Sequence, residues 1–423
     1  MTDISLTAHG GSFTADVHVP GDKSLSHRAL LFAGMAEGDS LVQGLGPGAD
    51  IAATARALRQ LGVSVDGDKV RSPGIGGWRA PEAPIDCGNS GTTMRLLAGA
   101  LSTTSVQATL SGDASLSARP MRRLVDPLRS LGGVIDTTNG TAPLTVGGAT
   151  AAHGSDVSID IASAQVRSAF AFAALTAEGD SSIDSPTGFR DHTERWLAAV
   201  GRGEWSSNTR FVIHPGPLPA ARFEVPGDPS SAAYLWACAA ISPGSKVTTR
   251  SVSLNPGRLG FLQILDDMGA GVEAEVTGAT GGDPVGDVTV EGKNLHGTVV
   301  DGALVASALD ELPLVAVLGA YAEGITTVRD ASELRAKESD RIEAVVDMVR
   351  ALEGGIEPAE DGFDVVGTGF LSGGRVETRH DHRIAMSAAV AATRADDTVV
   401  IGDAEIAAVS WPDFYGALEL LWS

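Results

Sequence analysis

Positive charge is scarce in this sequence, which has 31 lysines and arginines against 53 aspartates and glutamates and a formal net charge of -22. Nucleic acids and anionic membranes bind to surfaces whose basic residues neutralise phosphates, so we expect neither as a partner. A small anion can still bind where the few cations gather locally. The deficit therefore directs attention to short motifs that contain several basic residues.

Long apolar runs and cysteines are scarce as well. No stretch of about 18 or more apolar residues occurs, and residues 1–4 lack the basic and apolar regions of a secretion signal. We therefore expect a cytoplasmic protein without a membrane span. Cys87 and Cys238 lie in different halves of the chain, and no Cys/His spacing is typical of zinc. This pattern favours buried free thiols over a disulfide or a metal site.

The chain nearly repeats itself, because residues 17–24 return as residues 223–230. In each copy an alternating strand stops at Pro-Gly, and a serine-containing turn leads into an apolar helical run. Only the first copy carries the basic residues Lys23, His27 and Arg28. A helix start offers free backbone N–H groups to an anion, and nearby cations strengthen that offer. We therefore expect an anionic ligand near Lys23.

A shorter repeat lies within the halves. A helical segment, a glycine and a strand recur, first at residues 58–63 and again at 128–133. Glycine is a common stop after a helix, and Val-x-Val alternation is typical of a strand. About six such units fit into the 423 residues. Because units of this kind cannot bury a core alone, three in each half predict two globular α/β domains.

Two predicted helix starts carry cations together with hydroxyl groups or glycine. Ser24 and Arg28 are four residues apart and so share one face of a first turn. Arg28 can bind carboxylate or phosphate in a bidentate manner, whereas Lys23 is a point charge that can also move a proton. Residues 86–95 lead into another apolar helix, where Gly91 allows a ligand to approach the backbone closely.

Three further helix starts in the first half repeat this theme. Arg119 precedes a helix that we expect to begin with proline in its first position. Residues 163–168 and 190–195 open two more. Capping by Ser163 and Asp191 explains these two without a ligand. So many polar helix starts in one half nevertheless favour a shared anion site.

Acidic residues join the cations in three segments of the second half, residues 310–311, 337–341 and 380–383. Mixed charge suggests proton transfer as well as binding. We expect a helix from near Ser332, on which Lys337 and Arg341 lie four residues apart and opposite an apolar stripe. Ion pairing within this exposed run accounts for Asp340.

These motifs closely resemble those of the 5-enolpyruvylshikimate-3-phosphate synthase family, also called 3-phosphoshikimate 1-carboxyvinyltransferases. The resemblance covers the whole chain. It rests on blocks that occur in family order at residues 21–31, 88–97, 118–121, 163–165, 190–194, 225–233, 333–342 and 381–386. The blocks at 163–165 and 190–194 resemble the subgroup often called class II, which includes glyphosate-tolerant members.

The resemblance implies a two-domain inside-out α/β barrel of six βαβαββ-type repeats, three in each domain, with helices inside and sheets outside. Two chain crossings at Val19-Pro20 and Val225-Pro226 are expected to form a hinge. One domain, which binds shikimate 3-phosphate, then comprises residues 20–225. The other comprises residues 1–19 and 226–423. Substrates are expected to close the domains together, and helix N-termini supply positive potential in an acidic protein.

The implied reaction transfers the enolpyruvyl group of phosphoenolpyruvate to the 5-hydroxyl group of shikimate 3-phosphate and releases phosphate, as a step of the shikimate pathway. It proceeds by addition and elimination through a tetrahedral intermediate, without a metal or other cofactor. By motif position the catalytic residues are Lys23, Asp310 and Glu338. Lys23 resembles the family lysine near the phosphate and bridging oxygen, Asp310 the residue near the 5-hydroxyl group, and Glu338 the proton shuttle to the methylene carbon. The division of proton transfers among them is left open.

Motif positions also imply which residues hold the substrates. Those for shikimate 3-phosphate are Lys23, Ser24, Arg28, Ser163, Gln165, Arg190, Asp310 and Lys337. Those for phosphoenolpyruvate are Lys23, Gly91, Arg119, Gln165, Arg341 and Arg383. Several arginines suit a small, highly charged anion. Gly91 retains the small residue associated with room for glyphosate, whereas the subgroup motifs favour tolerance, so the response to this inhibitor is left open.

Three residues depart from the family pattern. Arg167 stands where the subgroup has lysine, Gly257 interrupts an Asn-x-Thr-Arg pattern, and Val409 stands where some members place a lysine on phosphoenolpyruvate. These departures leave the class assignment open.

Two other functions compete with this interpretation. The related UDP-N-acetylglucosamine enolpyruvyl transferases share the fold and the chemistry, but Asp113 is not at the right distance from Arg119 to match their reactive loop residue. A non-catalytic sensor of organic phosphates is the second alternative, and the presence of Lys23, Asp310 and Glu338 argues against it. A P-loop nucleotide hydrolase is excluded because no Walker motif occurs. We expect a monomer.

Overall fold

The computed structural model describes residues 2–422, which divide into two compact units. Unit 2 consists of Gly21–Pro226 and Ala279–Asp283, and unit 1 contains the rest of the chain. The chain thus changes unit after Pro20 and after Pro226, in the two copies of the repeated segment. It also enters unit 2 for the short stretch Ala279–Asp283, which the sequence did not predict.

The three sheets of unit 2 share one pairing pattern, in which the first pair is parallel and the other pairs are antiparallel. They contain, in spatial order, β14 (Arg222–Glu224), β3 (Glu37–Gln43), β5 (Lys69–Pro73) and β4 (Ser64–Asp66); β6 (Ile85–Asp86), β7 (Ala108–Ser111), β9 (Thr141–Val146) and β8 (Ile135–Thr138); and β10 (Asp156–Ser158), β11 (Ser181–Asp184), β13 (Phe211–Ile213) and β12 (Gly203–Trp205).

Unit 1 also has three sheets among the described residues, two of them four-stranded and one three-stranded. They contain β16 (Gly271–Thr280), β17 (Asp283–Glu291), β15 (Lys246–Ser253) and β2 (Thr14–Val17); β18 (Val299–Val300), β19 (Glu323–Val328), β21 (Gly362–Thr368) and β20 (Gly355–Ala359); and β1 (Ile4–Leu6), β23 (Val399–Gly402) and β22 (Gly374–Glu377). Within residues 2–422, six sheets therefore confirm the six predicted repeats.

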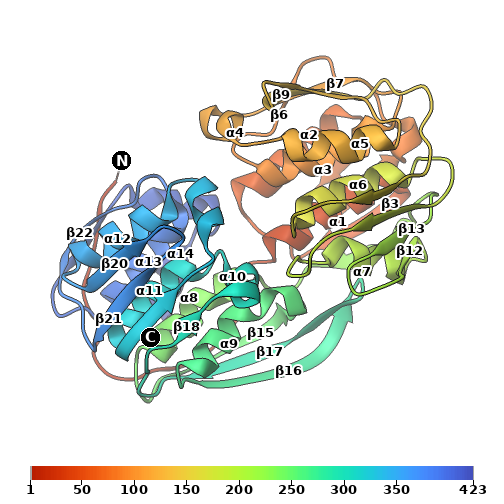
Figure 1. Ribbon diagram of the computed structural model, residues 1–423. Coiled ribbons are helices and arrows are strands. Elements are labelled where there is room, and N and C mark those ends of the chain that lie inside the picture. Colours follow the sequence, from red (N-terminus) through yellow and green to blue (C-terminus); the bar gives the residue numbers. More distant parts are fainter. Residues whose placement is uncertain (1, 423) are drawn as a thin grey trace. The chain divides into compact units, whose positions relative to one another are not determined.

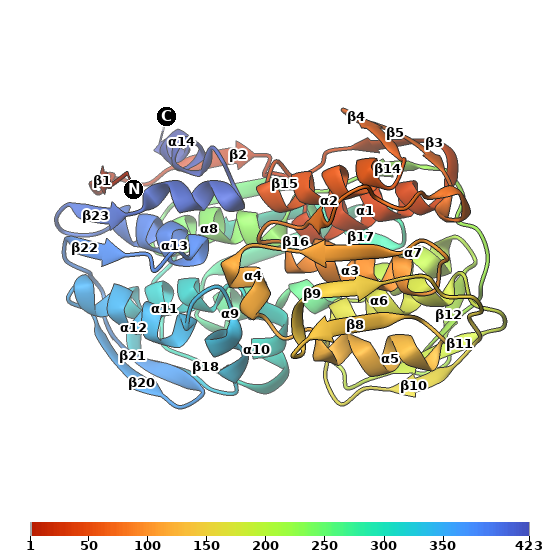
Figure 2. The ribbon, with the colours of Figure 1, turned by 90° about the horizontal axis from the view of Figure 1, so that it is seen from above.

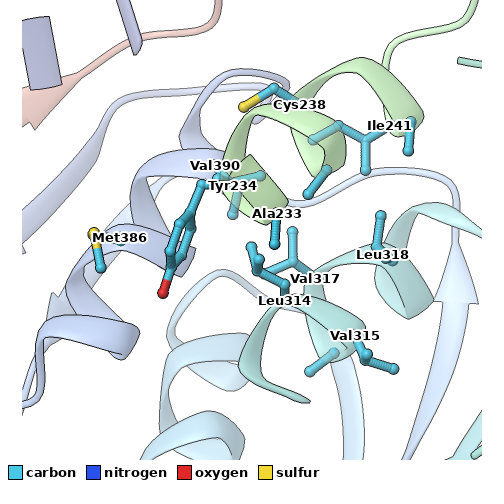
Figure 3. Packing of buried hydrophobic residues seen from close by; sticks show 14 of the residues in the cluster. Ala233, Tyr234, Cys238, Ile241, Leu314, Val315, Val317, Leu318, Met386 and Val390 are labelled. Carbon is cyan, nitrogen blue, oxygen red and sulfur yellow. The ribbon is translucent and has the colours of Figure 1, made fainter. Parts of the chain in front are cut away.

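One helix of each repeat is buried along nearly its whole length, and beyond its first two turns it has almost no polar side chains and therefore no polar face. These central helices are α1 (Lys23–Met35), α3 (Gly91–Ser102) and α6 (Ala164–Ala174) in unit 2, and α8 (Pro229–Ala240), α11 (Leu312–Tyr321) and α13 (His382–Ala392) in unit 1. A helix without a polar face must lie in the core, so in each unit the helices lie between the sheets (Figures 1 and 2). Figure 3 shows Ala233 of α8, Leu314 of α11 and Val390 of α13 meeting in the core of unit 1. The inside-out α/β fold is confirmed.

The other α-helices are shorter or bury only part of their surface. They are α2 (Ala49–Gln60), α4 (Ala114–Ala118), α5 (Val125–Ser130), α7 (His192–Ala199), α9 (Gly260–Asp267), α10 (Gly302–Ala308), α12 (Arg341–Ala351) and α14 (Phe414–Glu419). Short 3₁₀ helices are η1 (Ile75–Gly77), η2 (Arg122–Leu124), η3 (Pro256–Arg258), η4 (Ser332–Ala336), η5 (Ala404–Val409) and η6 (Leu420–Trp422). Among residues 2–422 no single helix has the length and apolarity of a membrane span, although α10 and α11 reach them as a pair bent by 109°.

Two predicted helix starts are wrong. Arg119 follows α4 in an extended conformation, and the next α-helix begins only at Val125 after η2. Proline does occur early in that helix, as Pro127 in its first turn, where no N–H donor is needed.

The helix expected from Ser332 is interrupted. The segment η4 ends at Ala336, and Lys337 is extended with φ -87° and ψ -156°. Asp340 then caps α12 by accepting from the Glu343 N–H, so the helix begins at Arg341. Lys337 and Arg341 are therefore not one helical turn apart.

Candidate active site

Three central helices of unit 2 begin with residues that the sequence assigned to substrate binding. Asp22 caps α1 by accepting from the Leu25 N–H at 2.7 Å, and Ser90 caps α3 by accepting from the Thr93 N–H at 3.1 Å. Ser163 caps α6 in the same way, which confirms its predicted capping role. Capped N-termini hold their remaining N–H groups in a fixed direction, and this suits them to bind anions.

Lys23 is the first residue of α1, and its ammonium group forms an ion pair with Asp50 in the first turn of α2. The side chain of Lys23 is 30% exposed, whereas that of Asp50 is 11% exposed. Asp50 therefore fixes the position of the ammonium group and leaves part of it open to solvent.

Arg28 is more deeply buried than its sequence pattern suggested. Its Nε donates to Thr193 Oγ1 at 2.8 Å, its Nη1 to the Ser24 carbonyl at 3.0 Å and its Nη2 to Ser168 Oγ at 2.8 Å. Burial lowers the pKa of Arg28 to about 10, which still leaves the group charged at neutral pH. All its acceptors are neutral, so Arg28 retains its full positive charge beside the start of α1.

A second group of residues surrounds the start of α3. Arg95 Nη1 donates to Gln165 Oε1 at 2.6 Å, and Gln165 Nε2 donates to Thr92 Oγ1 at 3.0 Å. A Cβ atom on Gly91 would lie 2.7 Å from Arg95 Nη1 and 3.5 Å from Arg119 Nη1. The structure thus brings Gly91, Gln165 and Arg119 together.

Arg95 belongs to this group although its motif alone did not assign it to a substrate. Its position four residues after Gly91, on the same side of α3, is a signal that could have identified it.

Arg190 is half-buried and lies two residues before the start of α7. The next residue, Asp191, does not cap this helix as predicted. Its carboxylate accepts from Arg195 Nε at 2.8 Å instead, and this ion pair competes for the capping oxygen. Thr193, in the first turn of the same helix, accepts from Arg28, so the segment that carries Arg190 adjoins the start of α1.

In unit 1, four residues assigned to the site form one ion-pair network. Asp310 Oδ1 lies 3.4 Å from both Lys337 Nζ and Arg341 Nη1. Arg341 Nη2 donates to Glu338 Oε2 at 2.6 Å. The interrupted backbone between η4 and α12 allows Lys337, Glu338 and Arg341 to approach Asp310 from one side.

Asp381 organises this network, and its motif alone gave it no role. It accepts from Arg341 Nε at 2.7 Å, from Ser339 Oγ at 3.0 Å and from the Arg383 N–H at 2.9 Å, and it caps α13. Burial opposes ionisation of Asp381, but Arg341 and His382 outweigh it and lower its pKa. Conversely, Asp381, Glu338 and Asp310 raise the pKa of the buried Arg341.

Arg383 adjoins this network, and its guanidinium group faces other partners as well. Its Nη1 is 3.9 Å from Glu311 Oε1, and Glu311 in turn accepts from the Ser230 hydroxyl group. Tyr234 of α8, labelled in Figure 3, interacts with Arg383, and burial raises the pKa of its phenol to about 12. Burial opposes the charge on Arg383, but Tyr234 and the carboxylates of Asp310, Glu311 and Asp228 outweigh it and raise the pKa of the guanidinium group, which stays charged and can bind an anion.

Two of the residues that depart from the family pattern have structural roles. Arg167 Nε donates to Glu194 Oε1 at 2.6 Å, with side chains 0% and 1% exposed, and its guanidinium group stacks 4.0 Å from the Phe189 ring centre. Arg167 thus belongs to the core of unit 2. Gly257 lies in η3, whose last residue, Arg258, pairs with Asp228 at 2.9 Å.

The third departure, Val409, is half-buried at the end of η5. The cysteines are buried free thiols as predicted, and burial raises the pKa of Cys87 to about 12. In the part of the chain that the structure describes, no group of three or more His, Cys, Asp or Glu side chains could hold a metal ion.

Both units therefore place basic side chains at the N-termini of buried helices, which defines an α/β protein built to bind small anions. The chain matches the family model described as EPSP synthase (3-phosphoshikimate 1-carboxyvinyltransferase) over residues 8–418. It is 44% identical to the 3-phosphoshikimate 1-carboxyvinyltransferase of Herpetosiphon aurantiacus, covering 96% of this chain and 97% of that protein. The chain belongs to the EPSP synthase family.

Solved structures agree with this assignment. The EPSP synthase of Acinetobacter baumannii superposes with a TM-score of 0.90 at 38% identity, covering 99% of this chain and 98% of that one. The enolpyruvyl transferase NikO of Streptomyces tendae has a TM-score of 0.78 at 17% identity, which shows a shared fold alone.

Proposed function

We propose that this enzyme transfers the enolpyruvyl group of phosphoenolpyruvate to the 5-hydroxyl group of shikimate 3-phosphate and releases phosphate. Membership of a family of that name over nearly the whole chain carries the proposal. The residues needed for acid and base chemistry are all present: Lys23 lies in the cluster at the helix starts of unit 2, and Asp310 and Glu338 lie in the ion-pair network of unit 1. Their clustering supports a catalyst over a sensor that only binds.

We assign the two clusters complementary parts in this reaction. In unit 2, Lys23, Ser24, Arg28, Ser163, Gln165 and Arg190 bind shikimate 3-phosphate, and Lys23, Gly91, Gln165 and Arg119 contact phosphoenolpyruvate. In unit 1, Asp310 and Lys337 contact shikimate 3-phosphate, and Arg341 and Arg383 bind phosphoenolpyruvate. Hydroxyl, amide and guanidinium donors suit the hydroxyl and phosphate groups of the first substrate, and a carboxylate with phosphate suits paired arginines.

The chemistry requires two protons to be added, one to the methylene carbon and one to the departing phosphate, and two to be removed, one from the 5-hydroxyl group and one from the methyl group. Protonation of the methylene carbon makes the central carbon electrophilic, and the 5-hydroxyl oxygen adds to it as it loses its own proton. The tetrahedral intermediate then expels phosphate while a methyl proton leaves, which restores the double bond. Fixed cations stabilise the charge that develops on the departing phosphate.

The geometry suits Glu338, Asp310 and Lys23 to these proton transfers. Glu338 is held by Arg341, one of the arginines assigned to phosphoenolpyruvate, so its carboxyl group is near the carbon to be protonated in this scheme. Asp310 faces Lys337, which we assign to shikimate 3-phosphate, and this suits it to the 5-hydroxyl proton. Lys23 stands at the helix start that binds anions, next to the leaving phosphate.

We also propose that the enzyme acts as a monomer. We place it in the cytoplasm, because both substrates are multiply charged and do not cross membranes unaided. Glyphosate is a candidate inhibitor, since Gly91 leaves the space beside Arg95 and Arg119 free of a Cβ atom. Sedimentation of the purified protein tests the oligomeric state, and titration of turnover with glyphosate tests the inhibition.

Phosphate release from phosphoenolpyruvate tests the proposed function directly. We expect release with shikimate 3-phosphate as acceptor, and none without an acceptor or with UDP-N-acetylglucosamine. Release only with the nucleotide sugar would assign the protein to the related transferases. Saturable binding of shikimate 3-phosphate without release would instead indicate a sensor.

A further inference from the structure

The hairpin formed by β16 and β17 belongs to both units. Its strands lie in a sheet of unit 1, whereas the stretch at its turn, Ala279–Asp283, belongs to unit 2. The hairpin is thus a further covalent link between the units, besides the passages after Pro20 and Pro226. Strand β16 is exposed along most of its length, so the core of unit 1 does little to hold the turn in place.

The turn is anchored in unit 2 mainly on α7. Gly281 packs so closely on Trp196 that a Cβ atom would lie 2.3 Å from the indole ring. Asp283 Oδ2 lies 2.9 Å from His192 Nδ1, and both side chains are 0% exposed. Arg195 Nη1 donates to the Gly282 carbonyl at 3.4 Å. A fully buried carboxylate is costly to desolvate, so this one depends on partners such as His192 to hold it in place.

The first turn of α7 connects this anchor to the proposed shikimate 3-phosphate residues. Its consecutive side chains point to different partners: His192 contacts Asp283, Thr193 accepts from Arg28, and Glu194 accepts from Arg167. All three are buried.

Arg190 is tied to the same anchor. It precedes Asp191, whose carboxylate is held by Arg195 Nε at 2.8 Å. The same Arg195 Nε lies 3.7 Å from Asp283 Oδ1. Asp283 is therefore linked through α7 to both Arg28 and the residue beside Arg190.

We propose that Asp283 is a positioning residue for shikimate 3-phosphate, supplied by a hairpin of unit 1. By seating the turn on α7, it fixes the backbone that presents Arg190 and the hydroxyl group that orients Arg28. The inference rests on the proposed function, because those two residues are assigned to this substrate. Asp283 itself does not take part in the chemistry.

The test compares two variants that disturb the turn with two matched controls. Asp283→Asn removes the charge and keeps the shape, and Gly281→Ala introduces a Cβ atom against Trp196. Asp287→Asn alters a carboxylate on the same hairpin that pairs with Arg250 near the surface. Gly278→Ala adds a Cβ atom on the same hairpin where no atom lies within 4 Å.

We expect both turn variants to raise the KM for shikimate 3-phosphate about tenfold, with kcat and the KM for phosphoenolpyruvate within about twofold of wild type. The control variants should match wild type in all three constants. An unchanged KM for shikimate 3-phosphate in both turn variants would overturn the inference. A fall in kcat with an equal rise in both KM values and a lowered Tm would also overturn it, since that pattern indicates a merely structural role.

Calorimetric titration with shikimate 3-phosphate separates this inference from the proposed function. Absence of phosphate release by the wild-type enzyme contradicts the proposed function, whereas equal Kd values for wild type and Asp283→Asn contradict the positioning role. A Kd raised in Asp283→Asn and unchanged in Asp287→Asn supports it, whether or not turnover is observed.

Discussion

Helices α1 and α8 begin with the same repeated sequence and differ in what their first turns do. In both, an aspartate caps the helix. Each capping residue also forms a backbone hydrogen bond with the other copy of the repeat: the Asp22 N–H donates to the Pro226 carbonyl at 2.7 Å, and the Asp228 N–H donates to the Pro20 carbonyl at 2.8 Å. After the cap, α1 continues with Lys23, and α8 with proline.

The serines that follow show the contrast most clearly. Ser230 of α8 is 2% exposed and is occupied by Arg258 and Glu311. Ser24 of α1 is half-buried beside the partly open Lys23. The repeat therefore provides the backbone of both helix starts, and the side chains decide whether the start is filled by the protein or left for a ligand.

Replacement of Lys23 is expected to have the largest effect, since it removes the charge that distinguishes the first turn of α1 from that of α8. We expect Lys23→Met to reduce turnover at least about 1,000-fold, equivalent to about 4 kcal/mol of barrier. The fold should persist, because the side chain is partly exposed. Phosphate release and Tm measure the two effects.

Lys69→Met is the matched control for this variant, as Lys69 is exposed on β5 of the same unit. It should retain the wild-type rate. A Lys23→Met enzyme with near wild-type turnover would remove Lys23 from the proposed active site.

Asp381 is the centre of the ion-pair network of unit 1, whereas Lys23 at the start of α1 pairs with Asp50. We expect Asp381→Asn to lower the free energy of unfolding by about 3 kcal/mol at pH 7, because it leaves the buried Arg341 without its fully buried carboxylate partner. Denaturant unfolding of both proteins measures the difference.

The same difference should depend on pH. The pKa of Asp381 in the folded state lies below its ordinary value of 3.8, so its contribution to stability is complete well above that pH and is lost as the pH falls through the lowered value. The stabilities of wild type and Asp381→Asn should therefore converge in acid. A difference that stays constant down to a pH of about 3 would show that the ionised carboxylate is not the cause.

The sequence predicted the repeated framework well, because caps, glycine stops and apolar helical runs are local signals. The six repeats and the buried helices α1, α3 and α8 follow from them. The sequence prediction failed where a capping residue interrupts a helix that the apolar pattern would continue. Asp340 starts α12 afresh, so the helix expected from Ser332 does not continue.

The contacts of the candidate site were less accessible to sequence reasoning than its residue types. Asp381 and Asp283 act on residues far away in the chain, and no spacing rule reports such contacts. Likewise, Asp191 has the residue type of a helix cap, but a nearby arginine takes its carboxylate. Long-range ion pairs, unlike caps, become visible only in the folded structure.

The two serines offer a smaller and more direct test of the comparison. We expect Ser230→Ala to destabilise the protein by about 2 kcal/mol, since it leaves Glu311 and Arg258 without a buried hydroxyl partner. Ser24→Ala should change stability by less than about 0.5 kcal/mol and raise the KM for shikimate 3-phosphate. Denaturant unfolding and steady-state kinetics on both variants distinguish the roles, and the reverse pattern would refute the division into a filled and an open helix start.

The smallest expected effect concerns the start of α3. A Cβ atom at position 91 would lie 2.7 Å from Arg95 Nη1, and the far end of that flexible side chain can move aside toward Arg119. We expect Gly91→Ala to raise the KM for phosphoenolpyruvate about fivefold, or about 1 kcal/mol, and to weaken any inhibition by glyphosate at least as much. Gly76→Ala is the matched control, because a Cβ atom there would have no other atom within 4 Å and the backbone φ is ordinary. Equal KM values for the two alanine variants would show that phosphoenolpyruvate does not approach α3 at Gly91, and the two arginines would then need another ligand.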